Sequence, residues 1–207
     1  MRNILILALS SILWMSCSSI KKVKSGESQS AKAFQEELVE FYTNPKTTPL
    51  IDDEKTNFVG LSFFPIDKKY DIQAVFGPIN DGSVVKFPTS AKKIKEFKEY
   101  GIALFKLDNQ DVKLTIYQMY PLNEENKDHL FLPFTDLTTG ETSYGAGRYL
   151  DLKLSDLNLE KGTIHLDFNK TYNPYCAYSI HYNCPIPPAS NDISVAIEAG
   201  VSFKKKY

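Results

Sequence analysis

The strongest constraint on the fold is an alternation of apolar and polar side chains in the second half of the chain. Val112, Leu114 and Ile116 alternate with Lys113, Thr115 and Tyr117. The same period of two recurs at residues 164–169 and 193–198. Successive side chains of a strand point to opposite faces of the sheet, so each stretch predicts a strand with one buried face.

Other short apolar stretches extend this pattern over most of the chain. They predict strands at residues 58–64, 72–76, 84–87, 94–97, 101–107, 130–134 and 143–154. Turn-forming residues such as Asn80-Asp81-Gly82 and Lys161-Gly162 lie between them. Many short strands with regular turns favour a mainly β domain, built as an antiparallel sandwich or a barrel-like sheet.

One stretch before the strands has a helical period instead. Phe34, Leu38 and Phe41 fall on one helical face, Ser30 is a suitable cap, and Asn44-Pro45 is a suitable end. The sequence therefore predicts a short amphipathic N-terminal helix within a single domain that covers residues 31–207.

The first residues resemble an export signal. Arg2 precedes an apolar run at residues 4–15, which is too short to span a bilayer as a helix. The Ser16-Cys17 junction resembles a bacterial lipoprotein site, in which residues 1–16 are removed and Cys17 carries lipid. Residues 17–30 are polar and predict a flexible tether. We expect a membrane anchor through lipid on Cys17, and the alternative is an ordinary signal peptide with an incidental cysteine.

The charge balance and the motifs narrow the possible functions. The formal net charge is −1, so the chain offers no basic field for nucleic acid. Gly145 and Gly147 lack the third glycine of a dinucleotide loop, and no nucleophile elbow is present, so no cofactor is predicted.

Cys176 and Cys184 lie eight positions apart, with His181 between them. In an exported protein, paired cysteines usually oxidise, so a disulfide that pins the proline-flanked loop 173–188 is expected. Two alternatives remain. A zinc site would need these three residues plus a distant His129 or His165, and a reactive dithiol would usually have closer cysteines.

Arg148 is the only arginine after the signal segment, in a chain that otherwise uses lysine. A guanidinium holds a carboxylate or phosphate with two hydrogen bonds, which lysine cannot do. Arg148 therefore predicts a clamp for an anionic ligand. The alternative is a structural ion pair with Asp136, Asp151 or Asp167.

Further polar residues near Arg148 complete the predicted ligand site. Asp167 and Asn169 share one face of a predicted strand, and Asp136 and Asp167 could form a general acid/base pair. Tyr144 and Tyr172 offer flat apolar faces with polar tips. The alternative is that these side chains cap turns and hold the loop.

Four segments together resemble one known family. They are FVGLSFFPID (58–67), LFLPFTDLTTGETSYGAGRYLDL (130–152), LDFNKTYNPYCAYS (166–179) and YNCPIPPASNDISVAIEAG (182–200). They are similar to DUF1684, a bacterial family of unknown function that includes lipoproteins of Bacteroidetes-type bacteria. The resemblance supports the domain bounds and a shared site, but it implies no activity. From the N-terminal segment we expect an exported, lipid-anchored protein of the cell envelope, in the outer membrane, with its domain on the periplasmic or surface side.

Three functions are compatible with these observations. The first is a module that binds a small anionic or polar ligand, or an envelope protein, around Arg148. The second is a hydrolase-like or metal-dependent enzyme that uses Asp136, Asp167 and Arg148. The third is a purely structural envelope protein.

Overall fold

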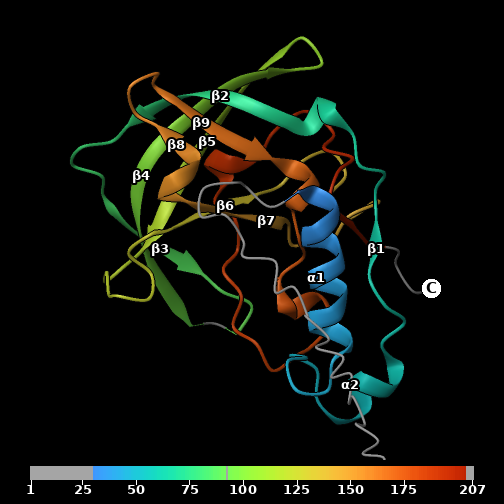
Figure 1. Ribbon diagram of the computed structural model, residues 1–207. Coiled ribbons are helices and arrows are strands. Elements are labelled where there is room, and N and C mark those ends of the chain that lie inside the picture. The colour runs from blue at the N-terminus through green and yellow to red at the C-terminus, as the bar shows by residue number, and fades with distance from the viewer. Residues whose placement is uncertain (1–29, 92, 204–207) are drawn as a thin grey trace, which may run out of the picture.

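The computed structural model describes residues 30–91 and 93–203 (Figure 1). The predicted signal peptide, Cys17 and the tether up to residue 29 lie outside the described residues. In the described part of the chain, no helix is long and apolar enough to cross a membrane.

The described chain is mainly β, as predicted. Its helices are α1 (Ala31–Thr43) and α2 (Asp52–Asn57), with 3-10 turns η1 (Lys68–Tyr70), η2 (Leu154–Asp156), η3 (Phe168–Lys170), η4 (Tyr175–Ala177) and η5 (Ala189–Asn191). Its strands are β1 (Ser62–Phe63), β2 (Asp71–Pro78), β3 (Val84–Pro88), β4 (Ile94–Leu107), β5 (Gln110–Met119), β6 (His129–Phe134), β7 (Arg148–Lys153), β8 (Leu157–Asn158), β9 (Thr163–Asp167) and β10 (Val201–Ser202).

Helix α1 confirms the predicted N-terminal helix. The Ser30 side chain accepts a hydrogen bond from the backbone N–H of Ala33, which caps the first turn. Tyr42 is the buried residue of the helix. Gln35 donates from its side-chain amide to the carbonyl of Asn169, so the helix is attached to the region of η3.

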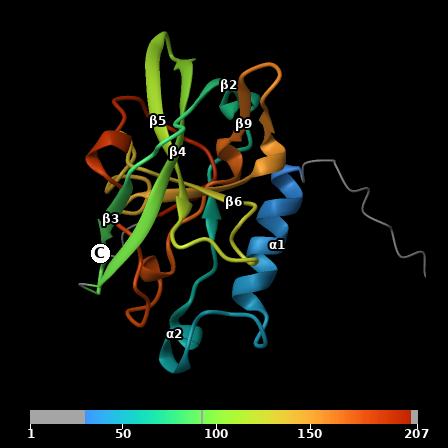
Figure 2. The ribbon, with the colours of Figure 1, turned by 90° about the vertical axis from the view of Figure 1, so that its left-hand side faces the viewer.

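Eight strands form one antiparallel sheet in the order β7-β6-β5-β4-β2-β9-β8, and β3 pairs with β4 beside this path. Strands β1 and β10 form a separate two-stranded sheet. No ladder joins β7 to β8 among the described residues, so the predicted sandwich or barrel arrangement is not confirmed. The sheet is curled but not closed (Figures 1 and 2).

The long strand β4 provides the bend. It pairs with β3 through residues 94–98 and with β2 through residues 101–104, and its register with β5 shifts between Glu99 and Gly101. A Cβ atom at position 101 would lie 2.3 Å from the ring of Phe76, so the close approach of β2 requires glycine there.

The main core lies inside the curl. One apolar cluster joins Ala74 and Phe76 of β2 and Leu166 of β9 to Leu132 of β6 and Leu150 of β7. Strands from opposite ends of the sheet therefore face each other across this core.

Four predicted strands are wrong in whole or in part. Within residues 164–169, β9 ends at Asp167 and η3 follows, so Asn169 does not share a strand face with Asp167. Within residues 58–64 only β1 forms, and within residues 143–154 only β7 forms. Residues 193–198 form no strand, although Ile193, Val195 and Ile197 are buried and the residues between them are more exposed. This C-terminal segment is extended, as its alternation indicates, but side chains rather than a neighbouring strand satisfy much of its backbone.

Arg148 donates two hydrogen bonds to this part of the backbone. Its guanidinium donates to the carbonyl oxygens of Ala199 (2.6 Å) and Ile197 (2.7 Å). It also forms an ion pair with Asp136 at 3.2 Å, and Asp136 accepts the backbone N–H of Ile197 at 2.6 Å. Both charged side chains are 0% exposed. Burial lowers the pKa of the Arg148 guanidinium, and Asp136 beside it acts in the opposite direction.

Asn191 bonds two strands at the other end of the segment. Its side-chain oxygen accepts the N–H of Thr115, and its amide nitrogen donates to the carbonyls of Thr115 and Pro133. The side chain therefore bridges the backbones of β5 and β6 with the hydrogen bonds that a peptide group would form. The two strands pair directly only through Tyr117 and Phe131.

Replacing Arg148 tests its structural role. We expect Arg148→Met to lower the free energy of unfolding by about 3–5 kcal/mol, because it leaves the Asp136 carboxylate buried without a cation. Arg148→Lys should lower it by about 1–3 kcal/mol, because lysine keeps the charge but cannot reach all of the acceptors. Urea denaturation measures both values.

Lys106→Met is the matched control, because the ion pair of Lys106 with Asp111 has exposed partners. It should change the stability by less than about 1 kcal/mol. A loss at Arg148→Met no larger than that of the control would contradict the structural role.

Candidate functional site

The predicted ligand-site residues do not form one site. Arg148 and Asp136 lie together in the core, with no exposed side-chain surface and with protein partners on the guanidinium nitrogens Nη1 and Nη2. The ion-pair alternative, with Asp136 as the partner, is what the structure shows. The geometry offers no route by which a ligand could reach Arg148.

Asp167 and Asn169 also have structural positions. Asp167 caps η3 by accepting the backbone N–H of Asn169, and the Asn169 amide bonds both the N–H and the C=O of Asp67. Tyr144 donates its hydroxyl hydrogen to the carbonyl of Cys176. Of the predicted residues, only Tyr172 lines the cavity described next.

That cavity, here called the aromatic pocket, has a volume of about 350 Å³. It is lined by the aromatic residues Phe97, Phe131, Tyr149, Tyr172, Tyr175 and Tyr182, by the polar residues Lys95, His129, Asp151 and Asn183, and by Met119, Pro174, Cys184 and Pro185.

The floor of the aromatic pocket is the face of the sheet opposite the main core. Phe131 of β6 faces Asp151 of β7 and Tyr117 of β5 across the ladders, while the adjacent Leu130 and Leu132 point into the core. Phe97, Phe131 and Tyr149 belong to a second buried apolar cluster on this face. These strands therefore bury apolar side chains on both faces.

The predicted disulfide forms one wall of the pocket. Cys176 and Cys184 are joined, with their Cα atoms 6.2 Å apart, so neither sulfur is a free thiolate for a metal or for redox exchange. The loop is also tied to the end of β3, because Ser90 donates its N–H to the Cys184 carbonyl and Ile186 donates to the Pro88 carbonyl. No group of His, Cys, Asp and Glu side chains in the described chain is arranged to hold a metal ion.

Hydroxyl hydrogen bonds fix the tyrosine rings around the pocket. Tyr149 donates to the carbonyl of Pro185, Tyr182 to the carbonyl of Pro49, and Tyr172 to the carboxylate of Asp151. The aromatic surfaces are therefore held in place without a ligand, as expected of a largely preformed binding site.

His129, Asp151 and Tyr172 form the polar end of the pocket. Nε2 of His129 lies 3.1 Å from Oδ1 of Asp151, and the Tyr172 hydroxyl lies 2.8 Å from Oδ2. The hydrogen bond to Asp151 raises the pKa of His129 against the opposing effect of its partial burial. Burial, reinforced by Asp151, raises the pKa of Tyr172 well above its ordinary value, so this hydroxyl stays protonated.

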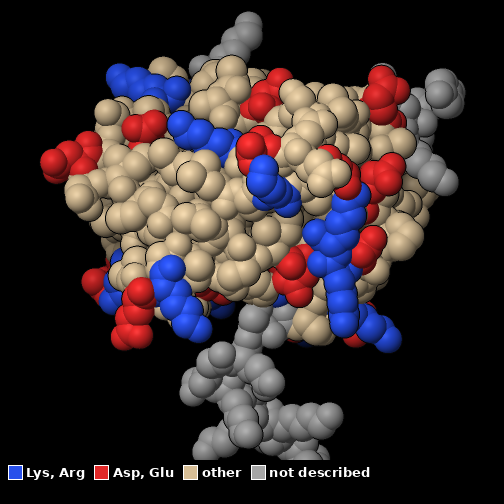
Figure 3. Space-filling model, turned by 90° about the horizontal axis from the view of Figure 1, so that it is seen from above, with Lys and Arg blue, Asp and Glu red and all other residues tan. Residues whose placement is uncertain are grey.

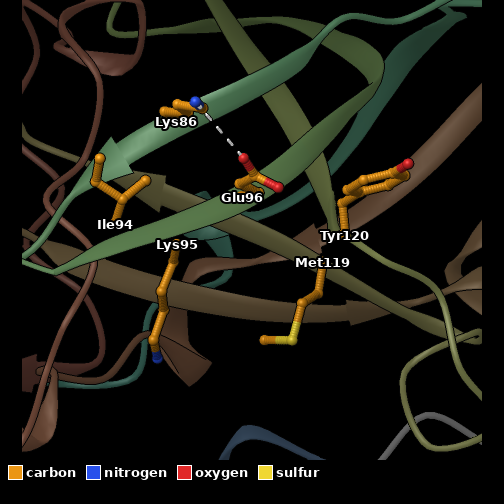
Figure 4. Close-up of a pocket in the computed structure, with 6 residues that line it drawn as sticks. All are labelled: Lys86, Ile94, Lys95, Glu96, Met119 and Tyr120. Carbon is orange, nitrogen blue, oxygen red and sulfur yellow. Dashed lines mark ion pairs between the residues drawn. The ribbon is translucent and has the colours of Figure 1, made fainter.

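Lys95 lies at the opposite end of the pocket. Figure 4 shows Lys95 and Met119 on one side of the strands, whereas Lys86 and Glu96 pair on the other side at 3.9 Å. The described residues provide no ion-pair or hydrogen-bond partner for the Lys95 ammonium. Lys95 therefore places a positive charge at this end of the pocket, and the carboxylate of Asp151 lies at the other end.

The family model described as "Protein of unknown function (DUF1684)" matches residues 56–202. The chain belongs to the DUF1684 family. The matched segment contains every residue that lines the aromatic pocket, and α1 lies outside it.

A solved structure gives a second likeness to this DUF1684 protein. A solution NMR structure of an uncharacterized protein of Haloarcula marismortui is 33% identical, with a TM-score of 0.65. The alignment covers 83% of this chain and 91% of that chain. The search of curated proteins gave no match.

Apart from Tyr172, the sequence analysis assigned none of the pocket residues to a ligand site. His129 entered only as a distant metal ligand, and Asp151 only as a partner for Arg148. The available signal was His129–Phe134, whose side chains are apolar on both faces beyond the histidine. That pattern indicates a strand that is buried on both faces. The regular alternation of apolar and polar residues in β5 indicates only one buried face.

The charge state of His129 is testable. We expect its pKa, followed by NMR of the imidazole, to lie above the ordinary value of about 6.5. Its pairing with Asp151 should stabilise the fold fully below that ordinary value, and this stabilisation should be lost as pH rises through the raised pKa. Asp151→Asn should lower the pKa of His129.

Asp71→Asn is the matched control, because it removes the carboxylate beside His165 and leaves His129 untouched. A pKa of His129 that falls equally in both variants would argue against the pairing with Asp151.

The disulfide wall is tested by the double variant Cys176→Ala/Cys184→Ala. We expect the free energy of unfolding to fall by about 2.5 kcal/mol, because the bridge closes a short loop. Amide exchange should accelerate at Ile186, whose N–H ties the loop to β3. A dithiol reductant should bring the unchanged protein to the same stability and leave the variant unaffected, and equal stability without reductant would contradict the prediction.

Proposed function

We propose that this protein is a lipid-anchored domain of the cell envelope that binds a small anionic or polar ligand in the aromatic pocket. One observation carries the proposal. A cavity of about 350 Å³ combines aromatic walls, a His129–Asp151 pair and the ammonium of Lys95, which has no ion-pair or hydrogen-bond partner among the described residues. Apolar walls with a few convergent polar groups are typical of small-ligand sites.

The lipid anchor rests on the N-terminal segment. The apolar run, the small residues and Cys17 support export and lipidation. The disulfide between Cys176 and Cys184 supports the same compartment, because disulfides persist mainly outside the reducing cytoplasm.

The enzyme alternative loses its residues. Arg148 and Asp136 are buried and bonded to each other, and Asp167 caps a turn. In the aromatic pocket, His129 and Asp151 could exchange protons, but its lining contains no serine and its cysteine is in a disulfide. These observations favour binding over covalent catalysis.

A pocket-filling variant tests the proposal. Met119 lines the pocket and is 40% exposed, so Met119→Trp can occupy the cavity without disturbing the main core. A screen of small organic anions identifies ligands that raise the melting temperature of the unchanged protein. We expect these ligands to leave the melting temperature of Met119→Trp unchanged.

Val84→Trp is the matched control, because Val84 is a strand residue that is 43% exposed and lies outside the pocket lining. It should keep the ligand-induced shift. Ligands that stabilise Met119→Trp and the unchanged protein equally would show that binding occurs elsewhere.

A further inference from the structure

We infer that the aromatic pocket takes an elongated, ring-bearing anion that carries a hydrogen-bond donor at the end away from its charge. This inference rests on the proposed function and adds the chemical class of the ligand. It follows from the order of three surfaces across the pocket, which are the Lys95 ammonium, the aromatic middle and the Asp151 carboxylate.

The middle of the pocket fits a flat ring. The rings of Phe97 and Phe131 are stacked with their centroids 5.1 Å apart, and Tyr149 meets Phe131 edge-on at 4.8 Å. These residues come from β4, β6 and β7, so the apolar floor extends across several strands. These three rings are 2–6% exposed and form the base of the pocket, whereas Tyr175 in the same lining is 36% exposed and offers ring surface to an aromatic ligand.

The Lys95 end fits the anionic group. Lys86 on the same hairpin pairs with Glu96, whereas the Lys95 side chain leaves the opposite side of the strand and lines the pocket (Figure 4). Half-burial next to Phe97 and Met119 reduces the water around the ammonium. A ligand carboxylate there would supply the missing counter-charge.

The Asp151 end fits a donor rather than a second anion. One carboxylate oxygen faces His129 and the other accepts from Tyr172, which positions the group. Each carboxylate oxygen has two acceptor sites, and the Asp151 side chain is 44% exposed. A ligand hydroxyl or amine could therefore donate to Asp151, whereas a second carboxylate would meet its negative charge.

The distance between the two ends sets the ligand length. Lys95 lies two residues before Phe97 on β4, and Asp151 lies three strands away on β7. Strand spacings put the two backbones on the order of 20 Å apart in a flat sheet, and the two side chains shorten the gap to about 10 Å. A single ring with a short acidic side chain and a distal hydroxyl spans such a gap.

Four probes separate these features. They are 3-(4-hydroxyphenyl)propanoate, which has every feature, 3-phenylpropanoate without the donor, 3-(4-hydroxyphenyl)propanamide without the charge, and the shorter 4-hydroxybenzoate. Calorimetry or NMR titration of the purified protein measures each affinity. We expect the complete probe to bind most tightly, and the amide to bind about tenfold more weakly, a loss typical of one charged contact.

Lys95→Gln should reduce the affinity for 3-(4-hydroxyphenyl)propanoate about tenfold and remove its advantage over the amide. Lys86→Gln is the matched control and should leave both affinities unchanged, because Lys86 already has Glu96 as a partner on the other side of the strand.

Equal binding of the acid and the amide, or no binding of any probe, would overturn the proposed ligand class. The proposed function would fail on a separate result, namely that Met119→Trp abolishes the melting-temperature shift of no ligand of any class. A ligand that Met119→Trp blocks but Lys95→Gln does not affect would keep the pocket as a binding site and reject the anionic end.

Discussion

The buried guanidinium of Arg148 is the interaction on which the rest of the structure depends. Its two donated hydrogen bonds to Ile197 and Ala199, together with Asp136, help to hold residues 193–199, which belong to none of the strands of the described chain. That segment carries Ile193, Val195 and Ile197 into the main core. Without fixed partners its backbone would be buried unsatisfied, which is costly in an apolar interior. The lone arginine is therefore explained by geometry, since lysine cannot donate to two carbonyls and a carboxylate from one planar group.

Once the C-terminal segment fills the inside of the curl, the outer face of β4–β7 becomes available for other contacts. Its aromatic side chains form a second cluster, and the disulfide loop covers part of that cluster. The cover is incomplete, and the remaining space is the aromatic pocket. The pocket is thus a consequence of strands that are apolar on both faces and of a loop too short to cover the outer one. Its walls are held by hydroxyl–carbonyl bonds and a covalent bridge, so they need no ligand to keep their positions.

Local patterns in the sequence predicted the local structure well, and non-local geometry explains the failures. The helix at α1 and the strand β5 follow from spacing alone. The disulfide followed from compartment and cysteine count. Residues 193–198 show a true alternation of burial, but their hydrogen-bond partners include residues 135–137 and Arg148, and Arg148 is 49 residues before Ile197 in the chain. The side chain of Asn191 likewise forms hydrogen bonds to the backbones of β5 and β6, where a neighbouring strand would normally do so. No short-range sequence pattern identifies such an asparagine.

The candidate site was harder to predict, because it depends on register. His129 and Asp151 are ordinary strand residues until the β6–β7 ladder brings them to one face, and Tyr172 reaches them through an isolated pairing with Tyr149. Arg148 and Tyr149 are neighbours in sequence, yet their side chains leave β7 on opposite faces, one toward the core and the other toward the pocket. The sequence predicted a ligand site at Arg148, whereas the aromatic pocket lies on the opposite face of the same strand. A shift of one residue along a strand exchanges its two faces, so composition alone cannot decide between a structural and a binding role.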